Sequence, residues 1–163
     1  MRTRGILGAG FAAAALAIGV LAPAYAATIT GTSGTDDLVG TTAADTIKAL
    51  AGNDVVHAGP GADTVYGGRG ADRLYGQRGA DLLVDDHGAA KDRLYAGPGN
   101  DRVYANYRDQ IATAGGDDRI VVAYPDPAMT IDCGTGYDRV TFNQPHPGVT
   151  LIGCERVRIV SAG

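Results

Sequence analysis

Aspartate residues recur at a fixed interval of nine along residues 31–84 of this chain. The six units are GTSGTDDLV, GTTAADTIK, ALAGNDVVH, AGPGADTVY, GGRGADRLY and GQRGADLLV. Each unit has Asp at its sixth place, namely Asp36, Asp45, Asp54, Asp63, Asp72 and Asp81. The chain has seventeen Asp and one Glu, which favours short carboxylates that reach only groups held near the backbone. A repeat of fixed period indicates an architecture of stacked, similar units.

Carboxylates repeated in this way are suited to holding a divalent cation. If units two repeats apart stack, their carboxylates form two columns and repel one another unless something cationic lies between them. The turns contain no Lys or Arg ladder that could neutralise them. Calcium takes six to eight oxygen ligands from carboxylates and backbone carbonyls, so it fits. The alternative is that these Asp side chains only cap the turns by hydrogen bonding.

An aliphatic residue at the eighth place of every unit indicates the strands that position the carboxylates. These residues are Leu38, Ile47, Val56, Val65, Leu74 and Leu83. Side chains alternate in direction along a strand, so an inward eighth residue leaves the seventh and ninth outward. One apolar residue in nine builds a core only if units stack, two to a coil, with coils about 4.8 Å apart. We predict an all-β fold, a parallel β-roll or β-solenoid of six-residue turns and three-residue strands.

Glycine holds the fourth place in five of the six units, with Ala43 as the exception. Such turns can bend carbonyl groups toward an ion because glycine adopts conformations that other residues avoid. The units resemble the hemolysin-type calcium-binding repeat, the RTX nonapeptide G-G-x-G-x-D-x-U-x with U aliphatic. Residues 67–75 match it at every defined position, and the other units lose one or both leading glycines. The resemblance is strong over 49–84 and looser across the rest of 31–141.

This resemblance implies a β-roll that binds calcium, as its cofactor, between turns two repeats apart. The implied metal ligands are Asp36, Asp45, Gly52, Asp54, Gly61, Asp63, Gly67, Gly68, Gly70, Asp72, Gly79, Asp81, Gly99, Asp101 and Asp118. RTX proteins commonly leave the cell through a C-terminal signal, whereas this chain has features of an N-terminal one, which argues against a toxin-like role.

The phase of the repeat shifts by two residues after Val84 and again at 122–123. Regular units return between the shifts, at 96–104 and 113–121. Small insertions in solenoids usually bulge from turns, so we expect the roll to continue through both. The predicted domain is 27–163, with core repeats at 31–121 and degenerate C-terminal coils and a cap at 122–163. Arg108 takes a fourth place that is otherwise glycine, and we expect a poor metal site there.

Cys133 and Cys154 occupy units eighteen residues apart, whose turns stack on one edge. A disulfide requires Cα atoms within about 7 Å, which neighbouring turns can provide. Export from the cell favours oxidation, so we predict that these residues form a disulfide in the cap. Free thiols or a metal pair are the alternative.

Residues 1–26 have the pattern of a secretory signal peptide: Arg2 and Arg4, an apolar stretch, and Ala24-Tyr25-Ala26 before the cleavage point. A membrane anchor is the alternative, but the apolar stretch is short for one. We predict a secreted, extracellular protein without a membrane partner after cleavage. Loss of the two arginines takes the net charge from −4 to −6, which argues against nucleic acid as a partner.

The outward places carry Tyr and Arg in several units, including Tyr75 and Tyr95. They pair across strands, or they form a face that binds a glycan or another cell-surface polymer. An extracellular adhesion or wall-binding module, with calcium only structural, is therefore the alternative function. The sequence has no G-x-S-x-G or H-E-x-x-H motif, and a carboxylate ladder offers no cleft for paired acid–base groups. We predict that the protein is not an enzyme; the rival is a β-helix enzyme acting on acidic polysaccharide.

Overall fold

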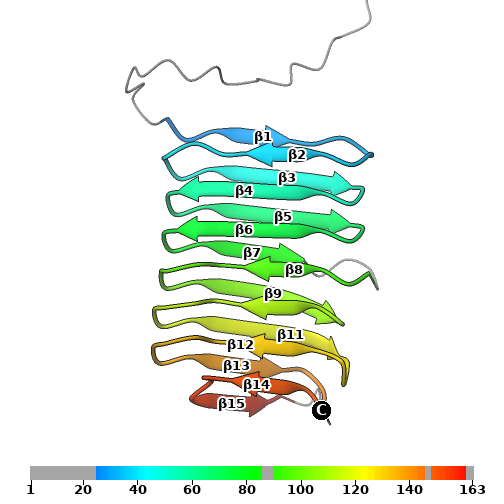
Figure 1. Cartoon of the computed structure of the whole chain (residues 1–163), viewed down its shortest axis with the longest axis vertical. Coiled ribbons are helices and arrows are strands. Elements are labelled where there is room, and N and C mark those ends of the chain that lie inside the picture. The colour runs from blue at the N-terminus through cyan, green and yellow to red at the C-terminus, as the bar shows by residue number, and fades with distance from the viewer. Residues whose placement is uncertain (1–24, 86–89, 146–147, 161–163) are drawn as a thin grey trace, which may run out of the picture.

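The computed structural model describes residues 25–85, 90–145 and 148–160, which wind into a parallel β-solenoid of about seven turns (Figure 1). Successive strands alternate between two sheets, so the predicted all-β β-roll is confirmed. All of the predicted signal peptide except Tyr25 and Ala26 lies outside the described residues. Within the described ranges, no helical segment has the length and hydropathy needed to span a bilayer.

Two parallel sheets form the long sides of the solenoid. Sheet A contains β1 (Thr28–Thr30), β3 (Thr46–Ala51), β5 (Thr64–Arg69), β7 (Leu82–Asp85), β9 (Arg102–Tyr107), β11 (Arg119–Pro125), β13 (Arg139–Phe142) and β15 (Arg156–Ile159). Sheet B contains β2 (Asp37–Val39), β4 (Val55–Pro60), β6 (Arg73–Arg78), β8 (Arg93–Tyr95), β10 (Gln110–Ala112), β12 (Thr130–Asp132) and β14 (Thr150–Ile152). Each coil contributes one strand to each sheet.

The eighth-place residues pack on one another between the sheets, as predicted. Ile47 pairs in register with Val65 in sheet A, and Val56 with Leu74 in sheet B. These four side chains have no exposed surface. The eighth-place residues thus form one apolar column in each sheet, and every coil adds one residue to each column.

The strands are longer than predicted in several units. β3, β4, β5 and β6 each span six residues where the sequence indicated three. The reason is that side-chain alternation continues past the ninth place, so the first place of the next unit also faces inward. Ala49, Ala58 and Ala96 hold this place and are fully buried. The prediction of six-residue turns was therefore wrong for these units.

Both shifts of phase are absorbed without breaking the sheets. Leu74 pairs with Leu94 across the first shift although twenty residues separate them. At the second shift, β11 has an irregularity between Ala123 and Pro125 and still pairs with β9 and β13. The strands on either side of both shifts stay stacked in register.

The predicted disulfide between Cys133 and Cys154 is present, with the two Cα atoms 5.2 Å apart. It joins the coil of β12 to the coil of β14 near the C-terminal end of the described chain. The degenerate coils are thereby linked covalently where the sixth-place Asp residues are lost.

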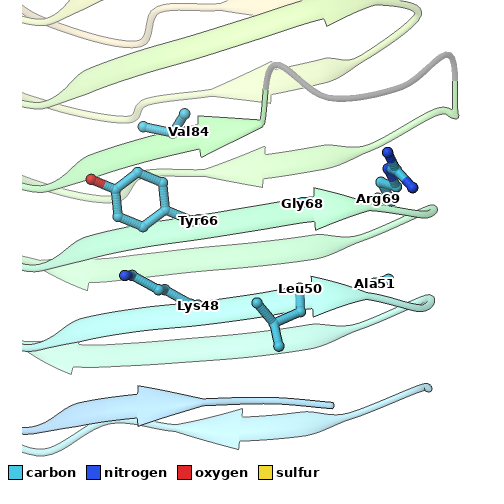
Figure 2. A pocket seen from close by; sticks show the side chains of 7 residues that line it. All are labelled: Lys48, Leu50, Ala51, Tyr66, Gly68, Arg69 and Val84. Carbon is cyan, nitrogen blue, oxygen red and sulfur yellow. The ribbon is translucent and has the colours of Figure 1, made fainter. Parts of the chain in front are cut away.

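Ninth-place side chains form rows on the outer faces. On sheet A, Lys48, Tyr66 and Val84 follow one another on β3, β5 and β7 (Figure 2). With Leu50 and Arg69 they line a shallow, mainly apolar hollow of about 590 Å³. This surface lies on the N-terminal half of the sheet, away from the arginine-rich half described below.

Candidate calcium-binding turns

The sixth-place Asp residues form the two predicted columns, and hydrogen bonds link the members of each column. The backbone N–H of Asp45 donates to Oδ1 of Asp63 at 2.7 Å, and that of Asp63 donates to Oδ1 of Asp81 at 2.8 Å. One column consists of Asp36, Asp54, Asp72, Asp92 and Asp109, and the other of Asp45, Asp63, Asp81, Asp101, Asp118 and Asp138. Each Oδ1 atom therefore has a structural role that is independent of any ion.

The second carboxylate oxygen, Oδ2, is buried without a hydrogen-bond partner in seven of these residues: Asp54, Asp63, Asp72, Asp81, Asp101, Asp118 and Asp138. We call their turns the open turns. A buried, unpartnered charged oxygen is unfavourable by several kcal/mol unless it meets a cation. These seven atoms are consequently the best candidate ligands in the described part of the chain.

Three turns are closed by the chain itself. Oδ2 of Asp36 and Oδ2 of Asp45 accept backbone N–H groups from the second-place Thr32 and Thr41. In the third, Oδ2 of Asp109 accepts the N–H of Asn106 at 2.8 Å. In these closed turns both carboxylate oxygens are occupied, which matches the turn-capping interpretation of the sequence.

The backbone at the second place distinguishes open turns from closed ones. Every open turn has a second-place residue with positive φ, namely Leu50, Gly59, Gly68, Gln77, Gly97, Ala114 and Gly134. The second-place residues of the three closed turns, two Thr and one Asn, do not adopt positive φ. This conformation is unfavourable for a non-glycine residue, so Leu50, Gln77 and Ala114 are strained. The strain coincides with the unpartnered oxygens.

Fourth-place glycines are required by the stacking of the turns. A Cβ atom at Gly70 would collide with the carbonyl oxygen of Gly52, and one at Gly79 with that of Gly61. Ala43 is tolerated because, unlike these glycines, it does not adopt positive φ. The glycines therefore bring backbone oxygens to the same edge as the carboxylates.

First-place glycines leave space into which oxygen atoms point. A Cβ atom at Gly76 would lie 2.5 Å from Oδ2 of Asp81 and 2.6 Å from the carbonyl oxygen of Ala96. At Gly67 it would lie 2.7 Å from Oδ2 of Asp85 and 3.1 Å from Oδ2 of Asp72. Carboxylate and carbonyl oxygens from neighbouring coils thus converge on the same space. This is the donor set that calcium prefers.

The open carboxyl groups have raised pKa values. The pKa values of Asp72 and Asp81 are raised to about 6, chiefly by burial and in part by the neighbouring carboxylates of the column, against a backbone hydrogen bond that lowers them. For the same reasons the pKa of Asp101 is about 7. Without a cation, these groups hold protons at a pH where an exposed Asp is ionised.

A comparison with protein-family profiles matches the RTX calcium-binding nonapeptide repeat over residues 30–65, 50–83 and 88–120, more than half of the chain. The chain belongs to the RTX calcium-binding repeat family. Comparisons with curated proteins and with solved structures give no match. RTX repeats imply calcium binding, the buried Asp-rich turns fit it, and the family is in general structural or ligand-binding rather than catalytic.

Among the described residues of the RTX roll, three carboxylates gather at the first shift of phase. Oxygen atoms of Asp72, Asp85 and Asp92 lie within 4.8 Å of one another, and all three residues are buried. Asp85 and Asp92 were not among the predicted ligands. Asp85 holds the first place of its unit. Side chains alternate along a strand, so the eighth and first places face inward on either side of the outward ninth place, and this alternation is the sequence signal that identifies Asp85.

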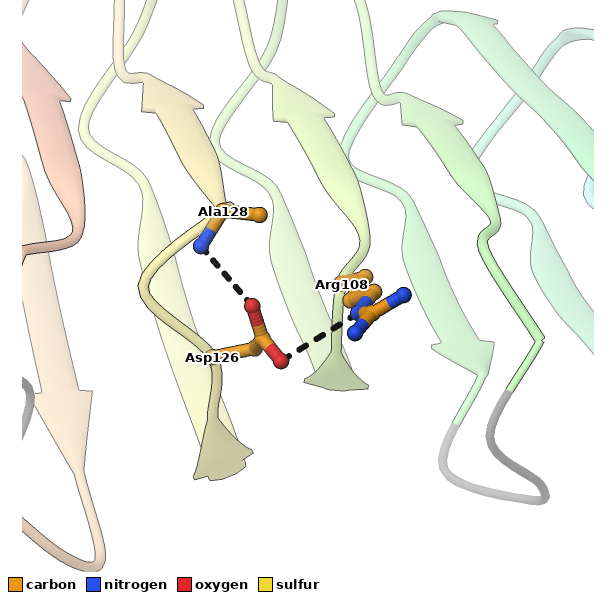
Figure 3. Close-up of polar contacts among 3 residues, drawn as sticks. All are labelled: Arg108, Asp126 and Ala128. Atoms are coloured by element: carbon orange, nitrogen blue, oxygen red, sulfur yellow. Dashed lines mark hydrogen bonds and ion pairs between the residues drawn. The ribbon is translucent and has the colours of Figure 1, made fainter.

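One column of the RTX roll ends in neutralised charge. Burial raises the pKa values of Asp92 and Asp109, and the backbone N–H of Asp92 donates to Oδ1 of Asp109 at 3.1 Å. Arg108, next to Asp109, donates to Oδ2 of Asp126 in the next coil at 3.3 Å, and Oδ1 of Asp126 accepts the N–H of Ala128 at 2.8 Å (Figure 3). A backbone hydrogen bond and Arg108 hold the pKa of Asp126 below its usual value. This turn has no open oxygen for an ion.

Proposed function

We propose that the protein is a secreted calcium-binding roll in which calcium ions bind at the open turns and complete folding. The observation that carries this proposal is the set of seven buried Oδ2 atoms without a hydrogen-bond partner, all in turns with a left-handed second place. Hydrogen bonds within the chain occupy both carboxylate oxygens in the closed turns but not in the open ones. The open turns require a positive charge that the described residues do not supply.

Calcium would be held by the open Asp carboxylates together with backbone carbonyl oxygens of the glycine-rich turns. In that role the predicted ligands Asp54, Asp63, Asp72, Asp81 and Asp101 use Oδ2, while Oδ1 continues to hold the neighbouring coil. The ion supplies positive charge between the stacked carboxylates. It thereby removes the repulsion between them and gives each buried carboxylate oxygen a partner of opposite charge. Asp36 and Asp45, whose oxygens are already occupied, are not needed as ligands.

Coupling of calcium to folding follows from the same geometry. The unfolded chain exposes its carboxylates to water and has no preformed site, so binding free energy becomes folding free energy. Extracellular calcium modules often bind at about 10⁻⁴–10⁻³ M, so the roll would fold after export. Secretion is supported by the N-terminal leader pattern, by the disulfide, and by the family, whose members are typically secreted.

Calcium binding is tested by equilibrium dialysis of residues 27–163 with calcium, and with magnesium as the control ion. We expect several calcium ions per chain and little magnesium. The double variant Asp81→Asn, Asp101→Asn should lower the number of bound ions. The matched variant Asp36→Asn, Asp45→Asn, in closed turns, should leave it unchanged. Absence of calcium binding, or an equal loss in both variants, would contradict the proposal.

A further inference from the structure

A row of arginine side chains lies along the outer face of sheet A and is not used by the calcium-binding turns. It consists of the seventh-place residues of four adjacent strands, Arg102, Arg119, Arg139 and Arg156, which pair in register. All four side chains are exposed. Neighbouring strands are about 4.8 Å apart, so the four arginines project from the sheet at regular intervals along a line parallel to the solenoid axis. We call this row the arginine ladder.

The arginine ladder has no partner of opposite charge among the described residues. The ninth-place residues beside it on the same face are Tyr104, Val121, Thr141 and Arg158. The one ion pair found in the described ranges joins Arg108 to Asp126, outside the ladder. In the adjoining turns, Asp117 accepts the backbone N–H of Tyr137 in the following coil, and Glu155 accepts that of Asp138 in the preceding coil.

Folding does not require this row of charges. Like charges on directly opposed residues destabilise a sheet, and an arginine does not lose its charge in a protein. The same column carries uncharged residues in the N-terminal half of sheet A, namely Thr46, Thr64 and Leu82. The chain as a whole is negative, with a net charge of −4. A row of positively charged side chains is unfavourable for the sheet. Binding of an anionic ligand by this row explains why a protein of negative net charge has it.

We propose that the arginine ladder binds a linear acidic polysaccharide that carries one carboxylate on each sugar ring. A straight line of guanidinium groups matches a ligand with anions in a line, and each guanidinium can hold a carboxylate through two hydrogen bonds. A hollow of about 320 Å³ lies beside the ladder, lined by Arg102, Tyr104, Arg119, Arg139 and Thr141 among others. It offers sugar rings an aromatic face and a hydroxyl group between the charges.

The aromatic residues of sheet B are a weaker candidate for this ligand. His57, Tyr75 and Tyr95 stack on one another, with ring centres 4.7 and 5.0 Å apart and nearly parallel planes. Their faces are used in cross-strand packing, as the first interpretation of these residues expected. Duplex DNA is also a poorer match, because its phosphates recur every 3.4 Å of axis along each strand and not at the strand spacing of a sheet.

Isothermal titration calorimetry with galacturonate oligomers of increasing length tests the proposal. The protein is residues 27–163, in whichever calcium condition circular dichroism shows the roll to be folded, so the test is separate from calcium binding itself. We expect affinity to rise with oligomer length until the four rungs are occupied, and then to level off. The methyl-esterified oligomer, which keeps the sugar chain and lacks the charge, should not bind.

Two variants of equal charge locate the site. Arg102→Gln, Arg119→Gln, Arg139→Gln should weaken binding at least tenfold without lowering the melting temperature, because exposed like charges are removed. Arg73→Gln, Arg78→Gln, Lys91→Gln, on exposed residues of the sheet B side, should change affinity less than twofold. Binding that survives in the ladder variant would mean that calcium bridges the polymer to other carboxylates, and would overturn the proposal. So would binding of the ester, or tighter binding of single-stranded DNA than of the oligomer.

Discussion

The backbone N–H of Asp63 donates to Oδ1 of Asp81 at 2.8 Å, while Oδ2 of Asp81 is buried and has no hydrogen-bond partner. One carboxylate thus performs two separate tasks. Oδ1 holds the preceding coil, and Oδ2 is available to a cation. Replacement of the carboxylate by an amide keeps an oxygen that accepts the N–H of Asp63 and removes the charge that a cation needs. The two roles can therefore be separated by mutation.

Replacement of Asp81 by Asn should stabilise the calcium-free roll and weaken the calcium-bound one. The Asn oxygen still accepts from Asp63, and its amide can donate toward the Ala96 carbonyl oxygen, which shares the same space. Removal of one buried unpaired charge should raise the free energy of unfolding without calcium by about 1–3 kcal/mol. Urea unfolding with and without calcium measures both effects. A loss of stability in both conditions would show that the charge itself supports the fold.

The stability of the calcium-free roll should fall as the pH rises. The pKa values of Asp72 and Asp81 are about 6 in the fold, above the ordinary Asp value of 3.8. The folded state therefore binds more protons than the unfolded state between about pH 4 and pH 7, and stability is lost across that window. Urea midpoints of metal-stripped protein should be higher at about pH 5 than at about pH 8. With calcium the order should reverse, because the ion competes with those protons.

Fourth-place glycines should tolerate alanine only where no earlier coil faces them. Gly79 has φ of 144° and stacks against the Gly61 carbonyl oxygen, so Gly79→Ala combines backbone strain with a collision. We expect a loss of about 2–4 kcal/mol in the free energy of unfolding. The control is Gly34→Ala, since Gly34 has no positive φ and its Cβ would meet only Thr32 Oγ1 at 3.8 Å. Equal losses in both variants would refute the stacking explanation.

Loss of the disulfide should destabilise the C-terminal coils more than it alters calcium binding. Cys133 and Cys154 close a loop with a sequence separation of 21 residues. The chain-entropy account predicts a cost of about 3 kcal/mol when both are replaced by Ser. Calcium-loaded protein, unfolded in urea, gives this value. Calcium should still bind at Asp54, Asp63, Asp72 and Asp81, which lie outside the closed loop, so any loss should be confined to the turn of Asp138 inside it.

The nine-residue period sufficed to predict the β-roll, the two Asp columns and the disulfide. It did so because the inward eighth place and the stacking of alternate units follow from strand geometry alone. The difference between open and closed turns could not be predicted in this way. It depends on the φ angle of the second place, where Leu50 and Gln77 adopt a conformation that their residue types do not favour. Thr32 and Thr41, which donate to Asp in closed turns, are the sequence signal for that alternative.

The third carboxylate at the shift of phase was missed for a related reason. Asp85 holds a first place, which the interpretation of the sequence left in a turn, and the pairing of β7 with β9 through Asp85 shows that the strand continues to this place. The outward arginines, in contrast, were predicted from their shared seventh place, and the structure shows that Arg102, Arg119 and Arg139 lie in register on sheet A.

Far-UV circular dichroism of residues 27–163, with calcium added to chelator-treated protein and magnesium as the control, tests the central claim most directly. The account predicts a loosely structured chain in chelator and a cooperative gain of β-sheet signal with calcium but not with magnesium. A chain that already has its full β-sheet signal in chelator and does not respond to calcium would contradict it.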